Sequence, residues 1–204
     1  MTKKHAPATA RNREPILGVL RDCLPGTGTV LEIASGTGEH AVAFAPALAP
    51  RYWLPSDRDP DNLASIAAWR AECPVDTLLA PVRLDVRETP WPVEEQPPPA
   101  PVSAVVAINL VHIAPWAATP ALMAGAARIL PAGGILYLYG PYRIDGRHTA
   151  PSNAAFDARL RAQNPDWGVR DLDEVVVAAA EAGLRFKARH AMPANNLSLV
   201  FVRD

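Results

Sequence analysis

The chain has 204 residues, a length that suits one domain able to bury a full α/β core. Its formal net charge at pH 7 is -1, which argues against a broad electrostatic surface for nucleic acid or anionic lipid. No apolar run approaches the length that spans a bilayer, and the basic N-terminus lacks the apolar core of a signal peptide. We therefore expect a soluble cytoplasmic protein without nucleic-acid or membrane partners, and the sequence leaves its oligomeric state open.

The cysteines and histidines give no pattern of a metal site. Cys23 and Cys73 have apolar or helical neighbours, which argues against a disulfide framework or a thiolate metal site. His5, His148 and His190 show no metal-ligand spacing with one another or with the cysteines. We therefore predict buried structural thiols and no metal.

The first elements along the chain are a flexible tail and an amphipathic helix. Residues 1–10 are interpreted as the tail, so that a single domain comprises residues 11–204. Apolar residues at helical spacing predict a helix over residues 14–24, with Pro15 in its first turn.

The next stretch, residues 30–40, carries the main motif. Mostly apolar residues lead into Gly36-Thr37-Gly38, and apolar residues at helical spacing resume from Ala41, a pattern that indicates strand, tight turn and helix. Glycines let a ligand approach the backbone, and free N–H groups at a helix start favour an acceptor-rich ligand such as a nucleotide. Glu32 is unusual, because an acid inside an apolar strand costs free energy unless a neighbouring group satisfies it.

Strands and helices then alternate to the end of the chain. The sequence predicts strands over residues 51–57, 77–86, 102–110, 135–139, 185–191 and 197–203. It predicts helices from the cap Asp59 to about 72, from the cap Thr119 to 130, from the cap Ser152 to 163, and from the cap Asp171 to 182 with Gly183 as terminator. Residues 90–101 are proline-rich and are interpreted as a surface loop. The last two strands are joined by too short a link for a helical crossover, so they must pair antiparallel.

This order predicts one doubly wound α/β domain with a terminal antiparallel hairpin. Ligands of such folds bind outside the carboxyl ends of the parallel strands. That rule brings the following residues to one rim of the sheet: Gly36, Gly38, Asp57, Asp85, Asn109, His112, Tyr142 and the turn Asn195-Asn196.

Two strand-end acids are suited to a nucleoside. Asp57 follows the glycine turn by about twenty residues, where a carboxylate can accept both ribose hydroxyls of an adenosine. A helix cap is the alternative role, but Asp59 already fills it. Asp85 is placed to accept a proton from the adenine amine, although a loop acid explains it nearly as well.

These residues resemble a known superfamily. The motif Glu32-x-x-x-Gly36-x-Gly38, with Asp57, Asp85 and a terminal hairpin, resembles the class I S-adenosylmethionine-dependent methyltransferases. More closely, several blocks that cover nearly the whole chain resemble the DUF938 (UPF0585) family, which includes methyltransferase-like protein 26: ARNREPIL, VLEIASGTGEHAVAFA, PSDRD, INLVHIAPW, YGPYRIDGRHTAPSNAAFD, NPDWGVRDLDEV and MPANN. The resemblance implies strand order 3-2-1-4-5-7-6 and S-adenosyl-L-methionine as cofactor, with a small-molecule acceptor that the sequence does not identify.

The motif and the resemblance together define the predicted site. The cofactor residues are Glu32, Ala34, Ser35, Gly36, Gly38, His40, Asp57, Arg58, Asp85, Val86, Asn109 and Leu110. Substrate contacts are assigned to Arg11, Asn12, His112, Tyr142, Asn195 and Asn196. Leu110 stands where the family usually has methionine, a volume-conserving change. The run Asn109-Leu-Val-His differs from the Asn/Asp-Pro-Pro-aromatic run of nucleic-acid amino-methyltransferases, which argues against a base as substrate.

His112 and Tyr142 are the predicted catalytic residues. Transfer from a sulfonium requires a base only if the nucleophile arrives protonated, and His112 is the best-placed candidate. A histidine hydrogen-bonded behind the pocket is an equal alternative. Tyr142 can orient substrate or approach the sulfonium through its ring, and packing explains it equally well.

Two other functions fit the same motif. A nicotinamide oxidoreductase is possible because Gly36-x-Gly38-x-x-Ala41 matches the dinucleotide fingerprint, but Glu32 and the terminal hairpin argue against it. A non-catalytic protein that binds S-adenosylmethionine and acts through a partner is the other, since no catalytic group is obligatory.

Overall fold

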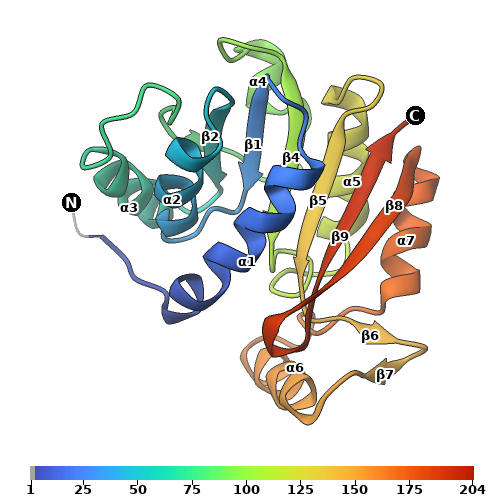
Figure 1. Cartoon of the computed structure of the whole chain (residues 1–204). Coiled ribbons are helices and arrows are strands. Elements are labelled where there is room, and N and C mark those ends of the chain that lie inside the picture. Colours follow the sequence, from blue (N-terminus) through green and yellow to red (C-terminus); the bar gives the residue numbers. More distant parts are fainter. Residues whose placement is uncertain (1–2) are drawn as a thin grey trace.

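The computed structural model describes residues 3–204 and shows a seven-stranded sheet with helices on both faces (Figure 1). The strands lie in the order β3-β2-β1-β4-β5-β9-β8. Their bounds are β1 Thr29–Ile33, β2 Tyr52–Asp57, β3 Val82–Arg83, β4 Val102–Ile108, β5 Ile135–Gly140, β8 Leu184–Met192 and β9 Asn196–Arg203. This is the predicted order, with the last two strands renumbered because a small separate hairpin, β6 Arg143–Ile144 and β7 Arg147–His148, precedes them.

The centre of the sheet is formed by strands that are buried on both faces. All five residues of β1 are buried, and β1 pairs in parallel with β2 and β4. Such strands appear in sequence as nearly continuous apolar runs because helices cover both faces of a parallel sheet. β9 runs antiparallel to both β5 and β8, as the short link between the last two strands requires.

The helices form two layers, each with its own hydrophobic core. Their bounds are α1 Pro7–Cys23, α2 Glu39–Ala47, α3 Pro60–Arg70, α4 Pro92–Glu95, α5 Ala118–Ile129, α6 Pro151–Gln163 and α7 Leu172–Glu181, with a 3-10 turn over Pro193–Asn195. Side chains of α1 and α2 pack on one face of the sheet, and side chains of α5 and α7 pack on the other. The parallel strands β1 and β5 run downward in Figure 1, and α6 and the small β6–β7 hairpin lie below their carboxyl ends.

The start of the first helix differs from the prediction. α1 begins at Pro7, inside the predicted tail, so Pro15 lies within the helix and not in its first turn. The early turns of α1 are polar and largely exposed, apart from the buried Thr9, and therefore lack the apolar spacing on which the prediction depended. Residues 3–6 are also held by side-chain contacts, while residues 1–2 of the predicted tail lie outside the described residues.

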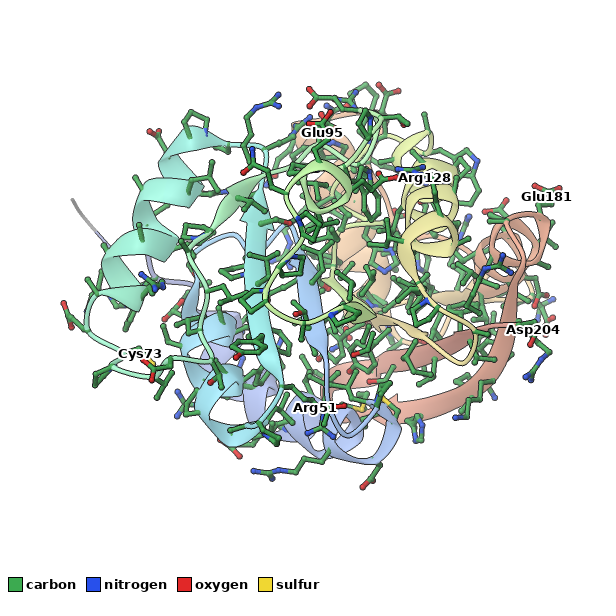
Figure 2. The ribbon with its side chains drawn as sticks, turned by 90° about the horizontal axis from the view of Figure 1, so that it is seen from above. Arg51, Cys73, Glu95, Arg128, Glu181 and Asp204 are labelled. Atoms are coloured by element: carbon green, nitrogen blue, oxygen red, sulfur yellow. The ribbon has the colours of Figure 1, made fainter. Side chains whose placement is uncertain are left out.

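The third strand and the proline-rich loop also differ from the prediction. β3 has two residues, and Leu78 adds an isolated bridge to Trp53, because Pro81 lacks the N–H that a continuous ladder needs. The expected loop over 90–101 contains the helical turn α4, which Trp91 anchors in the core beside Gly125. Figure 2 places α4, marked by Glu95, beside the part of α5 that carries Arg128, which bonds the neighbouring Glu94.

Two of the four expected helix caps are confirmed. Asp59 and Asp171 accept the backbone N–H two residues on and start α3 and α7. Thr119 and Ser152 do not cap, because α5 and α6 begin two residues earlier than these caps would require, at Ala118 and Pro151. The terminator Gly183 takes a positive φ of 81° as expected.

Candidate functional site

A cavity of about 220 Å³ lies at the carboxyl ends of β1, β2, β3 and β4. Eight of the predicted cofactor residues line it: Ala34, Gly36, Asp57, Arg58, Asp85, Val86, Asn109 and Leu110. The other lining residues are Ile33, Asn62, Leu84, Arg87, Ile108, Ile113, Ala114, Pro115 and Ala118, which the sequence analysis did not assign. Of the residues that the rim rule grouped, Gly36, Asp57, Asp85 and Asn109 line the cavity, and part of its apolar wall was not assigned.

The cavity wall contains two strained residues. Ala34 follows β1 with φ of 54°, and Asn109 follows β4 with φ of 62°. L-residues other than glycine rarely take this left-handed conformation, which costs about 1–3 kcal/mol and tends to persist at functional sites. These two positions follow adjacent strands and line the same cavity, so both lie where a ligand would bind.

The glycine turn has different requirements at its two glycines. A Cβ on Gly38, at φ of 91°, would lie 2.8 Å from the Cα of Ile66, so no side chain fits between the turn and α3. A Cβ on Gly36, at φ of 59°, would meet nothing closer than 4.0 Å. Gly36 therefore faces open space and lines the cavity, while Gly38 is needed for packing.

Asp57 connects the glycine turn to the end of β2. One carboxylate oxygen accepts the N–H of Gly36 at 2.9 Å and the other accepts the N–H of Asp59 at 2.9 Å. The residue is 4% exposed, yet its side chain lines the cavity. Each oxygen retains a free lone pair, so the carboxylate can accept two further hydrogen bonds, as a ribose diol requires.

Glu32 lies behind the cavity wall and does not line it. It is 2% exposed, and the Nε1–H of Trp53 donates to its carboxyl at 3.0 Å. Burial raises the pKa of Glu32 to about 7, although the hydrogen bonds from Trp53 and Ser35 oppose the rise. The neighbouring Ser35 is also turned away from the cavity, and its hydroxyl accepts the N–H of Ser56 at 3.1 Å.

Asp85 is already engaged at the mouth of the cavity. Arg87 donates to both of its oxygens, at 3.0 and 2.6 Å, and Arg58 lies 3.8 Å away. The hydrogen bonds from Arg87 lower the pKa of Asp85 to about 2. An ionised carboxylate between two arginines can still accept a bond from an amine, so the adenine role stays a prediction.

His112 and Tyr142 lie behind the wall, outside the residues that line the cavity. Both are 0% exposed and pack edge to face at 4.7 Å between ring centroids. Nδ1 of His112 accepts the backbone N–H of Arg170 at 3.2 Å, so the neutral ring carries its proton on Nε2. Burial lowers the pKa of His112 to about 3, and the charge of Arg170 adds to the effect. This matches the alternative of a histidine hydrogen-bonded behind the pocket.

The predicted residues on the α1 side and in the last hairpin do not line the cavity. Nε2 of His40 lies 2.9 Å from Oδ1 of Asn12, and burial lowers the pKa of His40 to about 4. Arg11 is exposed on α1. In the β8–β9 turn the backbone carbonyl of Asn195 accepts a bond from Asn153, and the side chain of Asn196 bonds backbone carbonyls of the same turn.

Sequence spacing did not indicate that the side chains of the missed lining residues face the cavity. Leu84 and Arg87 flank the predicted pair Asp85-Val86, and Ile113 to Pro115 belong to the INLVHIAPW block. Proximity in the sequence to predicted residues was therefore the only signal for them. Asn62 lies inside α3 and carried no signal at all. Among residues 3–204, no group of three His, Cys, Asp or Glu side chains is arranged to hold a metal ion.

A family model described as "Protein of unknown function (DUF938)" matches residues 3–203. The chain belongs to the DUF938 family. Several solved methyltransferase structures resemble this DUF938 chain. An O-methyltransferase family protein from Burkholderia thailandensis has a TM-score of 0.78 at 14% identity, covering 97% of this chain and 57% of its own. An O-methyltransferase family 2 protein from Planctomyces limnophilus, in complex with apigenin, has a TM-score of 0.76 at 20% identity, with coverage of 97% and 60%.

The S-adenosylhomocysteine-bound form of CalO1, a methyltransferase in calicheamicin biosynthesis, has a TM-score of 0.71 at 16% identity, covering 97% of this chain and 55% of that one. The DUF938 chain thus spans little more than half the length of these structures. At such identities the likeness establishes the class I methyltransferase fold. Within residues 3–204, no helix combines the length and apolar character needed to cross a membrane.

The residues of the DUF938 cavity fit S-adenosylmethionine. Apolar side chains from the ends of β3 and β4, such as Leu84, Val86 and Leu110, can flank a flat heterocycle. Asp57 leaves lone pairs for a diol, and Gly36 presents a face without a side chain.

Proposed function

We propose that this protein is an S-adenosylmethionine-dependent methyltransferase that acts on a small-molecule acceptor. The observation that carries the proposal is the cavity at the ends of β1 to β4, where the glycine turn and the Asp57 carboxylate meet an apolar wall. In a chain with the methyltransferase fold, this is the chemistry that holds an adenosine by its ribose and its base.

The division of work between ligand and protein follows from the chemistry of the sulfonium. When bound, S-adenosylmethionine supplies an activated methyl group, so the protein has to align the reactants and exclude water. Alignment of this kind can lower a barrier by about 7–11 kcal/mol. The contacts that hold Ala34 and Asn109 in the left-handed conformation also fix the backbone of the wall and thereby support a defined position of the ligand.

The burial of His112 bears on the acceptor. With Nδ1 used by the backbone of Arg170 and with a pKa of about 3, the imidazole cannot accept a proton from the acceptor near neutral pH. We therefore propose an acceptor whose nucleophilic atom needs no proton removed by His112, such as an atom that is already ionised. Tyr142, whose hydroxyl is buried, acts in this proposal by packing against His112.

The first experiment is calorimetric titration with S-adenosylhomocysteine and S-adenosylmethionine. Asp57→Ala should lose most of the affinity, because the diol loses both acceptors. Asp59→Ala is the matched control: Asp59 is an acid on the same loop that caps α3 and does not line the cavity. Absence of binding by the wild type at millimolar ligand would reject the proposed cofactor, and equal losses in the two variants would reject the role of Asp57.

Two further titrations distinguish the alternative functions. Fluorescence titration with NADH tests the dinucleotide reading of Gly36-x-Gly38-x-x-Ala41, and saturable micromolar binding of NADH without S-adenosylhomocysteine binding would favour it. Incubation of methyl-labelled cofactor with fractionated small metabolites tests turnover. Binding without transfer to any fraction would favour a non-catalytic protein.

A further inference from the structure

Residues 3–6, which precede α1, lie across α3 and the glycine turn (Figure 1). The backbone N–H of Lys4 donates to Oγ of Ser65 at 2.8 Å, and the indole N–H of Trp69 donates to the carbonyl of Lys4 at 3.0 Å. Lys3 forms an ion pair with Glu72. We call residues 3–6 the strap.

The strap connects to the glycine turn through two side chains. Ser65 is fully buried, and its hydroxyl donates to the carbonyl of Thr37 at 2.7 Å while it receives the N–H of Lys4. One oxygen of Glu39 accepts both the N–H of Ala6 at 2.7 Å and the hydroxyl of Thr37 at 2.9 Å. The carbonyl and the hydroxyl of Thr37 are therefore each bound to a group that also binds the strap.

A third connection reaches the cavity itself. Nζ of Lys4 donates to Oδ1 of Asn62 at 2.8 Å, and Asn62 lines the cavity. The other oxygen of Glu39 lies 3.4 Å from Nδ1 of His5. The strap thus holds both the turn that would receive the ligand and a side chain on the cavity wall.

We propose that the strap is a positioning element of the cofactor site, which holds Thr37 through Ser65 and Glu39, and Asn62 through Lys4, in the geometry that binds S-adenosylmethionine. The inference rests on the proposed function for the identity of the ligand. It assigns a role to residues that the sequence suggested were a flexible tail, and it makes cofactor affinity depend on a segment that lies outside the cavity lining. Ordering the turn before the ligand arrives reduces the entropy that binding would otherwise cost.

The test compares the wild type with a variant that lacks residues 2–6. We expect the Kd for S-adenosylhomocysteine to rise by about tenfold, because the free protein no longer holds the turn in one conformation. The unfolding temperature without ligand should fall by a few degrees at most, since the lost ion pair with Glu72 and the bond to Asn62 are exposed and only the bonds to Ser65 and Glu39 are partly buried. An unchanged Kd would overturn the inference. A large fall in unfolding temperature with an unchanged Kd would also overturn it, because the strap would then be a general stabiliser.

A pair of substitutions tests the connection within the full chain. Glu39→Ala removes the acceptor that joins Ala6 to Thr37 and should weaken binding of S-adenosylhomocysteine. Glu39→Gln keeps an oxygen in that place and should bind nearly as the wild type does. A variant that combines Glu39→Ala with removal of residues 2–6 should lose less binding free energy than the sum of the two separate losses, because both changes break the same connection. Equal affinities of the Ala and Gln variants would contradict the role of Glu39.

Amide hydrogen exchange separates this inference from the proposed function. The N–H of Gly38 donates to the carbonyl of Ser35 within the turn at 3.1 Å and can be followed without ligand. It should exchange faster in the variant without residues 2–6 than in the wild type. If the wild type fails to bind S-adenosylhomocysteine but this exchange is faster in the variant, the proposed function fails while the strap still orders the turn. Equal exchange rates would reject the strap.

Discussion

Glu32→Gln should make the protein more stable at alkaline pH. The carboxyl of Glu32 is 2% exposed, and its neighbours include a single aromatic N–H donor, from Trp53. Burial therefore raises its pKa from 4.5 to about 7. An amide of the same shape retains an oxygen for the Trp53 N–H and never ionises, so the variant avoids the cost of a buried charge.

The size of the effect follows from the pKa change. Each pKa unit corresponds to about 1.4 kcal/mol, so a rise from 4.5 to about 7 corresponds to roughly 3 kcal/mol. The folded protein holds this proton more tightly than the unfolded chain does. Stability from this group is therefore greatest below pH 4.5, is lost as the pH rises towards 7, and is constant above that.

Urea unfolding at pH 5 and pH 8 measures this prediction. Between these two values the wild type should lose about 2–3 kcal/mol of unfolding free energy relative to Glu32→Gln. The corresponding difference in unfolding temperature is about 5–10 °C for a chain of this size. Glu95→Gln, a change at an exposed carboxyl, is the control and should show no such pH-dependent difference. A stability difference between the wild type and Glu32→Gln that is equal at pH 5 and pH 8 would refute the reasoning.

Three further predictions concern the turn and the loop behind the wall. Gly38→Ala should lower the unfolding free energy by about 2 kcal/mol or more, because its Cβ would meet the backbone of Ile66. Gly36→Ala should lower it by about 1 kcal/mol, since its Cβ would face open space, and urea unfolding of the two variants measures the difference. His112 has a pKa depressed to about 3, so its contribution to stability is lost as the pH falls from 6.5 towards 3; His112→Gln should make acid unfolding less steep in that window. Arg170→Ala should lower the unfolding temperature by several degrees, since three backbone carbonyls lose a charged donor, and Arg159→Ala is the exposed control.

The sequence predicted those parts of the site that depend on local chemistry. Gly36 and Gly38 are needed by their own backbone conformation, and Asp57 ends a strand whose place in the sheet follows from alternation of strands and helices. Such features depend on neighbours in the sequence. The strand order followed from the family resemblance, whereas the apolar runs indicated only which strands are buried on both faces of the sheet.

The parts that were missed depend on contacts between distant residues. Asn62 reaches the cavity because α3 packs on the glycine turn, and Lys4 is ordered by groups about sixty residues away in the chain. The polar start of α1 showed no apolar period, so the helix was placed too late. His112 follows a strand end, which favours a rim position, but its ring is turned behind the wall by the backbone of Arg170.

The polar residues behind the wall explain how the strained residues on it persist. Ala34 precedes Ser35, whose N–H donates to the carbonyl of Ser56 at 2.8 Å, so the chain leaving β1 is fixed on the end of β2. Asn109 precedes a loop whose carbonyls are held by Arg170. Each left-handed residue costs about 1–3 kcal/mol and survives only where neighbouring contacts determine it. Substitutions behind the wall should therefore change ligand affinity through the backbone of the wall, as well as the stability of the fold.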